Sequence, residues 1–206
     1  MKRSEKVMGI FDSLKNIAKS TIRKEASKVV SGAVSSIGKG KNRSEKFTFS
    51  SLPKNLAELQ ILPEISMDTP FKTVALTILA LCQFEQSSDN TYEMLDFLKG
   101  PENVSPYEKQ FIKERLTDKY YIPFSYFIGA TPENGYIPSS PFTIEVFENP
   151  YSFDNENWAT LWVKSGGADN MRSVKLRKKP STGQWFLNDI QCLSEIRVPV
   201  EKDPWA

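Results

Sequence analysis

The sequence predicts an α+β protein in which helices come first and an antiparallel β-meander follows. Apolar residues recur at helical spacing up to about residue 119, and they alternate with polar residues from residue 141 onwards. No strand–helix–strand repeat is visible, which argues against a doubly wound parallel sheet. The expected architecture is therefore an N-terminal amphipathic helix, a helical half and a meander.

The charge of the chain divides at Lys46. Residues 1–46 carry 12 basic and 4 acidic residues, a net charge of +8. Residues 47–206 carry 15 basic and 21 acidic residues, a net charge of −6, and hold every Trp, Tyr, Pro and Cys. Such a shift in composition marks a boundary between unlike segments. We therefore expect a basic arm, residues 1–46, and one globular domain, residues 47–206.

The arm has the pattern of a basic amphipathic helix. Apolar residues follow a 3–4 spacing from Ile10 to Ile37. Five cations lie off this stripe: Lys15, Lys19, Arg23, Lys24 and Lys28. Such a helix can bind an anionic membrane surface, a protein partner or a second copy of itself; the other expectations are that it packs on its own domain or stays partly disordered. No signal-peptide-like stretch follows Met1, so we expect a cytoplasmic protein, peripheral to the membrane if the arm binds lipid.

Four helices are expected in the first half of the domain. The second of these, residues 70–86, is apolar on nearly every face, which predicts a buried central helix. Ser105, Pro106 and Glu108 form a capping box that opens a helix to about Lys119. The other two helices are expected to begin near Ser51 and to span residues 91–99.

The second half predicts strands at residues 141–147, 158–164, 173–179, 184–189 and 192–200, with a further short strand at 47–49. The turn Pro180–Gly183 predicts a hairpin in which Trp185 and Leu187 share one face and Phe186 points to the other. Residues 120–140, rich in Tyr and Pro, form a long connection between the two halves.

Several stretches resemble a bacterial domain family of unknown function. They include TPFKTVALTILALC, SPYEKQFIKERL, PFSYFIGATPENGYIPS and STGQWFL, within a resemblance that covers about residues 47–206. The resemblance implies no reaction, cofactor or catalytic residue. The order of helices followed by a curved meander is similar to the cone-shaped NTF2-like fold, at the level of fold alone.

The composition disfavours catalysis. The chain has no His, which removes the commonest general base and metal ligand, and its two Cys cannot form a four-cysteine zinc site. We therefore assign no catalytic residue, no cofactor and no metal. The acidic stretch at Asp154 and Glu156, with Asp169, lacks the EF-hand pattern and is interpreted as a turn.

Two surfaces could bind a ligand. Tyr126, Phe127, Trp158 and Trp162 could line a pocket between helices and sheet, although large aromatic residues more often form the core. Lys175, Arg177, Lys178 and Lys179 could contact single-stranded nucleic acid, but the net charge of −6 disfavours this partner and favours a solvated edge strand. The sequence therefore predicts a non-catalytic binding or assembly module, whose partner is a protein or a second copy. The alternative is a small-molecule-binding or enzymatic domain that uses the aromatic pocket.

Overall fold

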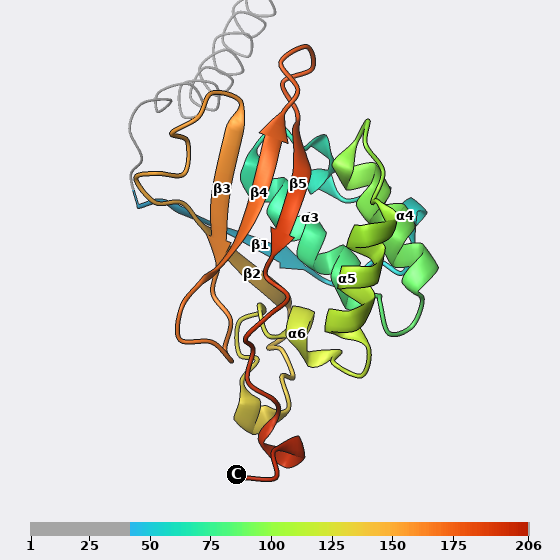
Figure 1. Ribbon diagram of the computed structural model, residues 1–206. Helices are drawn as coiled ribbons and strands as arrows, with labels where there is room; N and C mark the ends of the chain where they lie inside the picture. Colours follow the sequence, from blue (N-terminus) through green and yellow to red (C-terminus); the bar gives the residue numbers. More distant parts are fainter. Residues whose placement is uncertain (1–41, 206) are drawn as a thin grey trace, which may run out of the picture. The chain divides into compact units, whose positions relative to one another are not determined.

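The structure, a computed structural model, describes residues 42–205, in which helices precede the strands of an antiparallel sheet (Figure 1). The predicted arm helix lies outside the described residues. The helices are α2 (Leu56–Gln60), α3 (Pro70–Cys82), α4 (Ser88–Lys99), α5 (Pro106–Leu116) and α6 (Tyr121–Phe124). The strands are β1 (Ser44–Phe49), β2 (Phe142–Phe147), β3 (Trp158–Val163), β4 (Arg172–Lys178) and β5 (Trp185–Gln191). These elements confirm the predicted α+β class.

The five strands form one sheet in the order β1-β2-β3-β4-β5, with every neighbouring pair antiparallel. The last four strands are the predicted meander. β1 precedes the helices in the chain but pairs with β2 over the full length of both strands, from Ser44–Phe147 to Phe49–Phe142. Three residues of β1, Ser44 to Lys46, lie on the N-terminal side of the boundary expected at Lys46.

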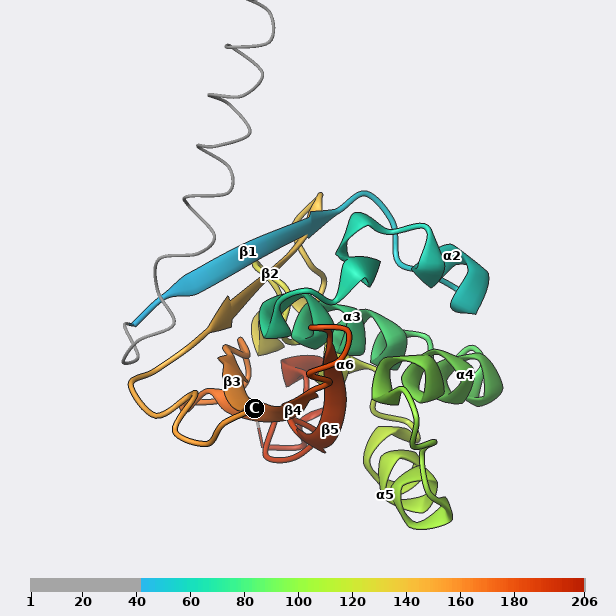
Figure 2. The same ribbon diagram turned by 90° about the horizontal axis from the view of Figure 1, so that it is seen from above.

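α3 is the buried centre of the domain, as its sequence predicts. Of its 13 residues, every one except Lys72 is buried. The sheet curls around this helix, with β1 and β2 on one side and β4 and β5 on the other (Figure 2). The hydroxyl of Thr73 donates a hydrogen bond to the carbonyl of Trp185 at 2.7 Å and so ties α3 to the first residue of β5.

The sheet has a buried inner face and an outer face that no described helix covers (Figures 1 and 2). On β3, Ala159, Leu161 and Val163 are buried, whereas Trp158 and Trp162 alternate with them and are partly exposed. The same alternation runs through β4, and through β5 as far as Leu187. Residues that alternate in this way lie on opposite faces of the sheet.

The helix starts follow their capping residues. In α5 the predicted capping box is present: Ser105 Oγ accepts from the Glu108 amide, and Glu108 accepts from the Ser105 amide. α4 begins at Ser88, three residues before the expected start at residue 91, because the Ser87 side chain caps it. α2 begins at Leu56, later than expected, because Asn55 caps it through a 3.0 Å bond from the Glu58 amide.

The Tyr-rich connection, residues 120–140, closes an opening in the sheet. β2 and β3 share only two residue pairs, Val146–Val163 and Phe147–Trp162. Beyond these pairs, Ile128 donates its amide to Thr143 on β2, and Gly166 after β3 donates its amide to Ser125. The connection thus bridges strands that have separated, and it contributes α6 and the 3-10 turn Pro132–Asn134.

The prediction of a strand at residues 192–200 was wrong. Cys192 and Leu193 are both buried, so the side chains do not alternate, and Glu195 has a positive φ of 58° that interrupts an extended chain. The segment instead crosses the Tyr-rich connection: the hydroxyls of Tyr126 and Tyr136 donate to the carbonyls of Cys192 and Arg197, both at 2.6 Å. It ends in a 3-10 turn, Val200–Lys202.

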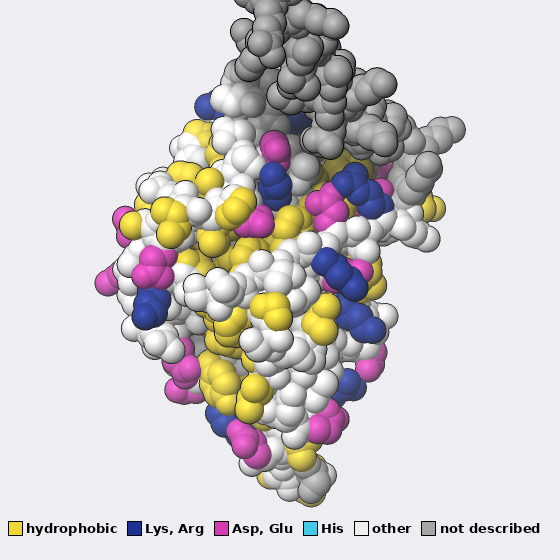
Figure 3. Space-filling view, turned by 180° about the vertical axis from the view of Figure 1, so that it is seen from behind, with side chains coloured by type: hydrophobic (Ala, Val, Ile, Leu, Met, Phe, Trp, Pro, Cys, Tyr) yellow, Lys and Arg dark blue, Asp and Glu magenta, His cyan; other side chains and the backbone are white. Residues whose placement is uncertain are grey.

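Apolar side chains also reach the surface. Ile61, Tyr107, Ile137, Tyr151 and Trp205 are each at least 70% exposed. On the face opposite to that of Figure 1, hydrophobic side chains form a band with charged side chains at its margins (Figure 3). Exposure of this kind is ordinary for a folded domain, because much of any protein surface is apolar.

Candidate functional site

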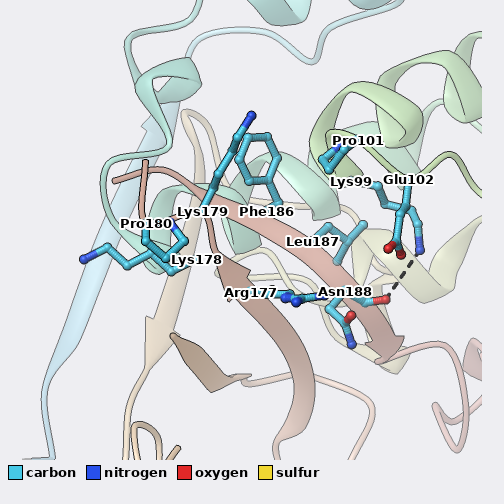
Figure 4. Close-up of a pocket in the computed structure, with 10 residues that line it drawn as sticks. All are labelled: Lys99, Pro101, Glu102, Arg177, Lys178, Lys179, Pro180, Phe186, Leu187 and Asn188. Carbon is cyan, nitrogen blue, oxygen red and sulfur yellow. Dashed lines mark hydrogen bonds between the residues drawn. The ribbon is translucent and has the colours of Figure 1, made fainter. Parts of the chain in front are cut away.

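A cleft of about 300 Å³ lies between the C-terminal end of α4 and the β4–β5 hairpin (Figure 4). We name it the cationic cleft. Its lining residues are Lys99, Pro101, Glu102, Arg177, Lys178, Lys179, Pro180, Phe186, Leu187 and Asn188. The end of α4 supplies one wall and the two strands supply the other, so residues about 80 positions apart in sequence meet here.

Glycine and a strand irregularity shape the cleft. Gly100 ends α4 with a φ of +75°, and a Cβ at this position would overlap the ring of Phe186. Only glycine allows the chain both this backbone conformation and this close approach. On β5, a bulge leaves Asn188 between Leu187 and Asp189 without a partner on β4, and Asn188 lines the cleft.

Four cations line the cleft, and within residues 42–205 only Lys99 has an ion-pair partner. Its ammonium lies 2.6 Å from a carboxylate oxygen of Glu108. Burial alone would raise the pKa of the Glu108 carboxyl, but Lys99 and the Ser105 amide and hydroxyl lower this pKa below its usual value. No acidic group among the described residues forms a salt bridge with Arg177, Lys178 or Lys179.

Aromatic rings hold two of these cations in place. The Arg177 guanidinium lies 5.3 Å from the centroid of the Trp158 ring, its partner across the β3–β4 ladder. The Lys178 ammonium lies 5.7 Å from the centroid of Trp185, its partner across the β4–β5 ladder, and so points away from Phe186 and the interior of the cleft (Figure 4). Such cation–π contacts orient a charge without neutralising it. The cleft therefore has a cationic rim, and Phe186, Leu187 and Pro101 provide its apolar surface.

The structure does not bring the four predicted pocket aromatics together. Tyr126 and Phe127 are each 2% exposed and belong to the core, where Phe127 packs against Phe124 and Phe142. Trp158 and Trp162 lie on the outer face of the sheet, not between the sheet and the helices. Burial raises the pKa of the Tyr126 hydroxyl well above its usual range, as expected for a phenol inside a core.

Trp162 borders a separate cleft. That cleft has a volume of about 440 Å³ and lies at the start of the described chain, where Asn42 and Arg43 also line it. Its apolar side chains are Phe147, Trp162 and Met171. Trp158 contributes to the cationic cleft only through Arg177.

The four basic residues predicted at the end of one strand do not all lie in the same place. Arg177, Lys178 and Lys179 line the cationic cleft, whereas Lys175 does not and lies 3.8 Å from an oxygen of Asp189. Sequence reasoning missed the opposite wall, Lys99 to Glu102. Only the stop signal Gly100-Pro101 hinted that the chain turns sharply there.

The remaining candidates do not form a site among the described residues. No group of three or more residues of the types Cys, Asp and Glu within residues 42–205 is arranged to hold a metal ion. Cys82 and Cys192 are free and buried; burial raises both thiol pKa values, that of Cys192 to about 12. The arm cations, Lys15, Lys19, Arg23, Lys24 and Lys28, lie outside the described residues.

These features define an α+β domain with a curled antiparallel sheet and a cationic, partly apolar surface cleft. The chain belongs to the family described as Domain of unknown function (DUF6935), whose family model matches residues 51–200. No curated protein and no solved structure matches the chain. No helix in the described part of the chain has the length and apolar character needed to cross a membrane.

Proposed function

We propose that this protein is a non-catalytic binding module and that the cationic cleft holds a small ligand with an anionic group and an apolar body. One observation carries the proposal: Arg177 and Lys179 line the cleft together with Phe186 and Leu187, and both lack an ion-pair partner among the described residues. Cations that lack an ion-pair partner can bind an anionic ligand. The cleft volume of about 300 Å³ is in the range of small-molecule sites.

The two halves of the ligand correspond to two parts of the cleft. Charge-assisted hydrogen bonds from Arg177 and Lys179 favour an anion, and the guanidinium favours one with two acceptor oxygens. Phe186 and Leu187 favour an apolar group beside that anion, because covering them removes apolar surface from water. A fully hydrophilic anion would leave this surface uncovered.

The proposal assigns no reaction to the cleft. The largest pKa shifts in the described chain belong to Tyr126, Cys82 and Cys192, which are buried and do not line the cleft. An acid–base catalyst must lie within hydrogen-bond reach of its substrate, and these three groups do not. The alternative of an enzymatic domain therefore has less support than a binding role.

Ligand binding is tested by calorimetry on the full chain with 1-naphthalenesulfonate and the neutral 1-naphthalenemethanol. The sulfonate is expected to bind more tightly. Each removed cation is expected to weaken sulfonate binding about tenfold, the equivalent of one charge-assisted hydrogen bond. The variants are Arg177→Gln and Lys179→Gln. The matched control is Lys175→Gln, on the same strand but outside the cleft. Equal binding of both probes, or an unchanged affinity in both cleft variants, would contradict the proposal.

A second proposal concerns the arm. It rests on the difference in net charge between residues 1–46, which carry +8, and residues 47–206, which carry −6. We propose a cytoplasmic protein whose arm binds an anionic membrane surface or a second copy of the chain. Sedimentation with vesicles containing phosphatidylserine, with and without residues 1–41, tests the membrane; sedimentation velocity without vesicles tests self-association. If the truncation changes neither result, the arm does not have this role.

Two other expectations, the bacterial origin of the chain and its similarity to the NTF2-like fold, stay predictions.

A further inference from the structure

Asn188 gives the cationic cleft a neutral polar group beside its cations. The bulge on β5 places it between Leu187 and Asp189, where it is partly exposed and lines the cleft. Within residues 42–205, its one hydrogen bond outside the β4–β5 ladder is accepted by its backbone carbonyl, from the Lys99 ammonium at 3.5 Å. The side-chain carboxamide can therefore offer a ligand both an acceptor oxygen and an NH2 donor.

The Asn188 carboxamide lies on the same face of the hairpin as the Arg177 guanidinium. Arg177 pairs with Phe186 across the ladder, and Asn188 follows Phe186 by two residues, so their side chains share a face. Figure 4 shows Arg177 and Asn188 on this wall of the cleft, whereas Glu102 stands beside Lys99 on the other wall. Diagonal neighbours on one face are about 7–8 Å apart, within reach of a long side chain. Both can therefore bind polar groups that are only a few bonds apart in one ligand.

We infer that the ligand is a carboxylic acid whose α-nitrogen is acylated, as in an N-acyl amino acid or at the carboxyl terminus of a peptide; this inference rests on the proposed function. The Arg177 guanidinium matches the two oxygens of a carboxylate. The Asn188 carboxamide matches the amide, because its oxygen accepts from the ligand N–H and its NH2 donates to the ligand carbonyl. Phe186 and Leu187 contact the apolar part of the ligand.

The cations of the cleft disfavour an amino acid with a free amine. Such an amine is mostly protonated at pH 7, and its positive charge would lie among Arg177 and Lys179, which line the cleft. Glu102 is the only carboxyl among the described residues that line the cleft, and it lies on the wall opposite to Arg177. Acylation removes the positive charge and turns the nitrogen into the donor that Asn188 can accept.

The experiment compares ligand probes by calorimetry on the full chain at pH 7. 3-Phenylpropanoate has the carboxylate and the ring of N-acetyl-L-phenylalanine but no amide, and the acetate ester of L-phenyllactate has an oxygen in place of the amide N–H. N-acetyl-L-phenylalanine is expected to bind about fivefold more tightly than the ester and about twentyfold more tightly than 3-phenylpropanoate, the equivalent of one and of two hydrogen bonds. L-Phenylalanine, with its free ammonium, should bind more weakly than 3-phenylpropanoate.

Asn188→Leu removes the carboxamide and retains a side chain of similar size. It is expected to lower the affinity for N-acetyl-L-phenylalanine at least fivefold more than that for 3-phenylpropanoate. A purely structural role of Asn188 would weaken both probes alike. The matched control is Asn170→Leu, the same exchange at an exposed position outside the cleft. Circular dichroism checks that each variant is folded, and the comparison of probes on the unaltered chain needs no variant.

Two further probes distinguish the sources of this chemistry. The tripeptide acetyl-Ala-Ala-Phe represents the carboxyl terminus of a polypeptide, and N-octanoyl-L-phenylalanine represents a small acyl amino acid. Whichever binds more tightly than N-acetyl-L-phenylalanine identifies the source, and either result supports the inference.

The outcomes separate this inference from the function on which it rests. If N-acetyl-L-phenylalanine and 3-phenylpropanoate bind equally and Arg177→Gln weakens both, the amide inference is overturned and the proposed function stands. The amide inference is also overturned if L-phenylalanine binds more tightly than its N-acetyl derivative. If no probe binds, or if Arg177→Gln changes no affinity, both proposals are overturned. A preference for the acylated probe that Asn188→Leu removes supports both.

Discussion

Gly100 lies directly against the ring of Phe186, so closely that a Cβ on the glycine would overlap the aromatic carbons. The contact joins the end of α4 to β5 and forms one corner of the cationic cleft. Gly100 also has a φ of +75°, which side chains disfavour. The position therefore carries two separate requirements, one for the backbone and one for the neighbouring ring.

Gly100→Ala is expected to lower the free energy of unfolding by about 3 kcal/mol or more. Backbone strain alone costs about 1–3 kcal/mol, and the overlap with the Phe186 ring adds to this cost. Gly183→Ala is the matched control, because Gly183 has nearly the same φ, +76°, but no atom within 4 Å of a Cβ. Urea denaturation followed by tryptophan fluorescence measures both variants. An equal loss in the two would show that Phe186 adjusts without cost.

Ser105→Ala is expected to destabilise the protein by about 1 kcal/mol, because it removes the hydroxyl that caps the first turn of α5. Chemical denaturation at pH 7 measures this loss. The control is Ser88→Ala: Ser88 is the first residue of α4, whereas Ser87 supplies the cap. The capping role is contradicted if the two variants are equally stable.

Glu108→Gln is expected to cost stability in a pH-dependent way. The native pKa of Glu108 is lowered from 4.5, so its ionised form stabilises the fold above this pH. As the pH falls below 4.5 and through the lower native pKa, the carboxylate is protonated and the contribution disappears. Unfolding free energies at pH 7, 5, 4 and 3 should show the difference between the two proteins shrinking only in acid. A constant difference would mean that the ionisation of Glu108 plays no part.

Tyr136→Phe is expected to destabilise the fold by about 1–3 kcal/mol at pH 7, because the carbonyl of Arg197 loses its 2.6 Å hydrogen bond. Burial raises the pKa of Tyr136 from 10 to about 12. A raised pKa contributes stability below pH 10 that is lost as the pH rises through 12. The variant should therefore lose less stability than the unaltered protein between pH 10 and 12. A parallel decline of the two would contradict this assignment.

The thiols of Cys82 and Cys192 are expected to react slowly with a disulfide reagent in the native protein. Both are buried, and burial raises the pKa of Cys192 to about 12, so little thiolate is present at pH 8. Absorbance at 412 nm after addition of 5,5′-dithiobis(2-nitrobenzoate) measures the reaction, and two thiols should react rapidly once urea unfolds the chain. Rapid labelling without urea would show that one of these sites opens readily.

Local signals in the sequence predicted most of the elements correctly. Each of these signals depends on residues only a few positions apart, so the sequence alone is enough to recognise it. Examples are the Ser105 capping box, the apolar helix after Pro70 and the alternation on β3. The prediction of a strand from residue 192 was wrong because two features that replace it depend on the tertiary structure. These are the hydrogen bond from the buried Tyr126 hydroxyl to the Cys192 carbonyl and the positive φ of Glu195.

The sequence by itself determined the fold class, the buried central helix and the outward direction of Phe186 on β5. Only the tertiary structure decided which charged residues meet. Lys99 and Arg177 are 78 positions apart, and no local pattern relates them, because the end of α4 approaches β5 only after the sheet has curled around α3. The same packing pairs Lys175 with Asp189 and leaves Arg177 held against Trp158 at the cleft. A site assembled from distant segments depends on long-range contacts, and these cannot be read from residue spacing.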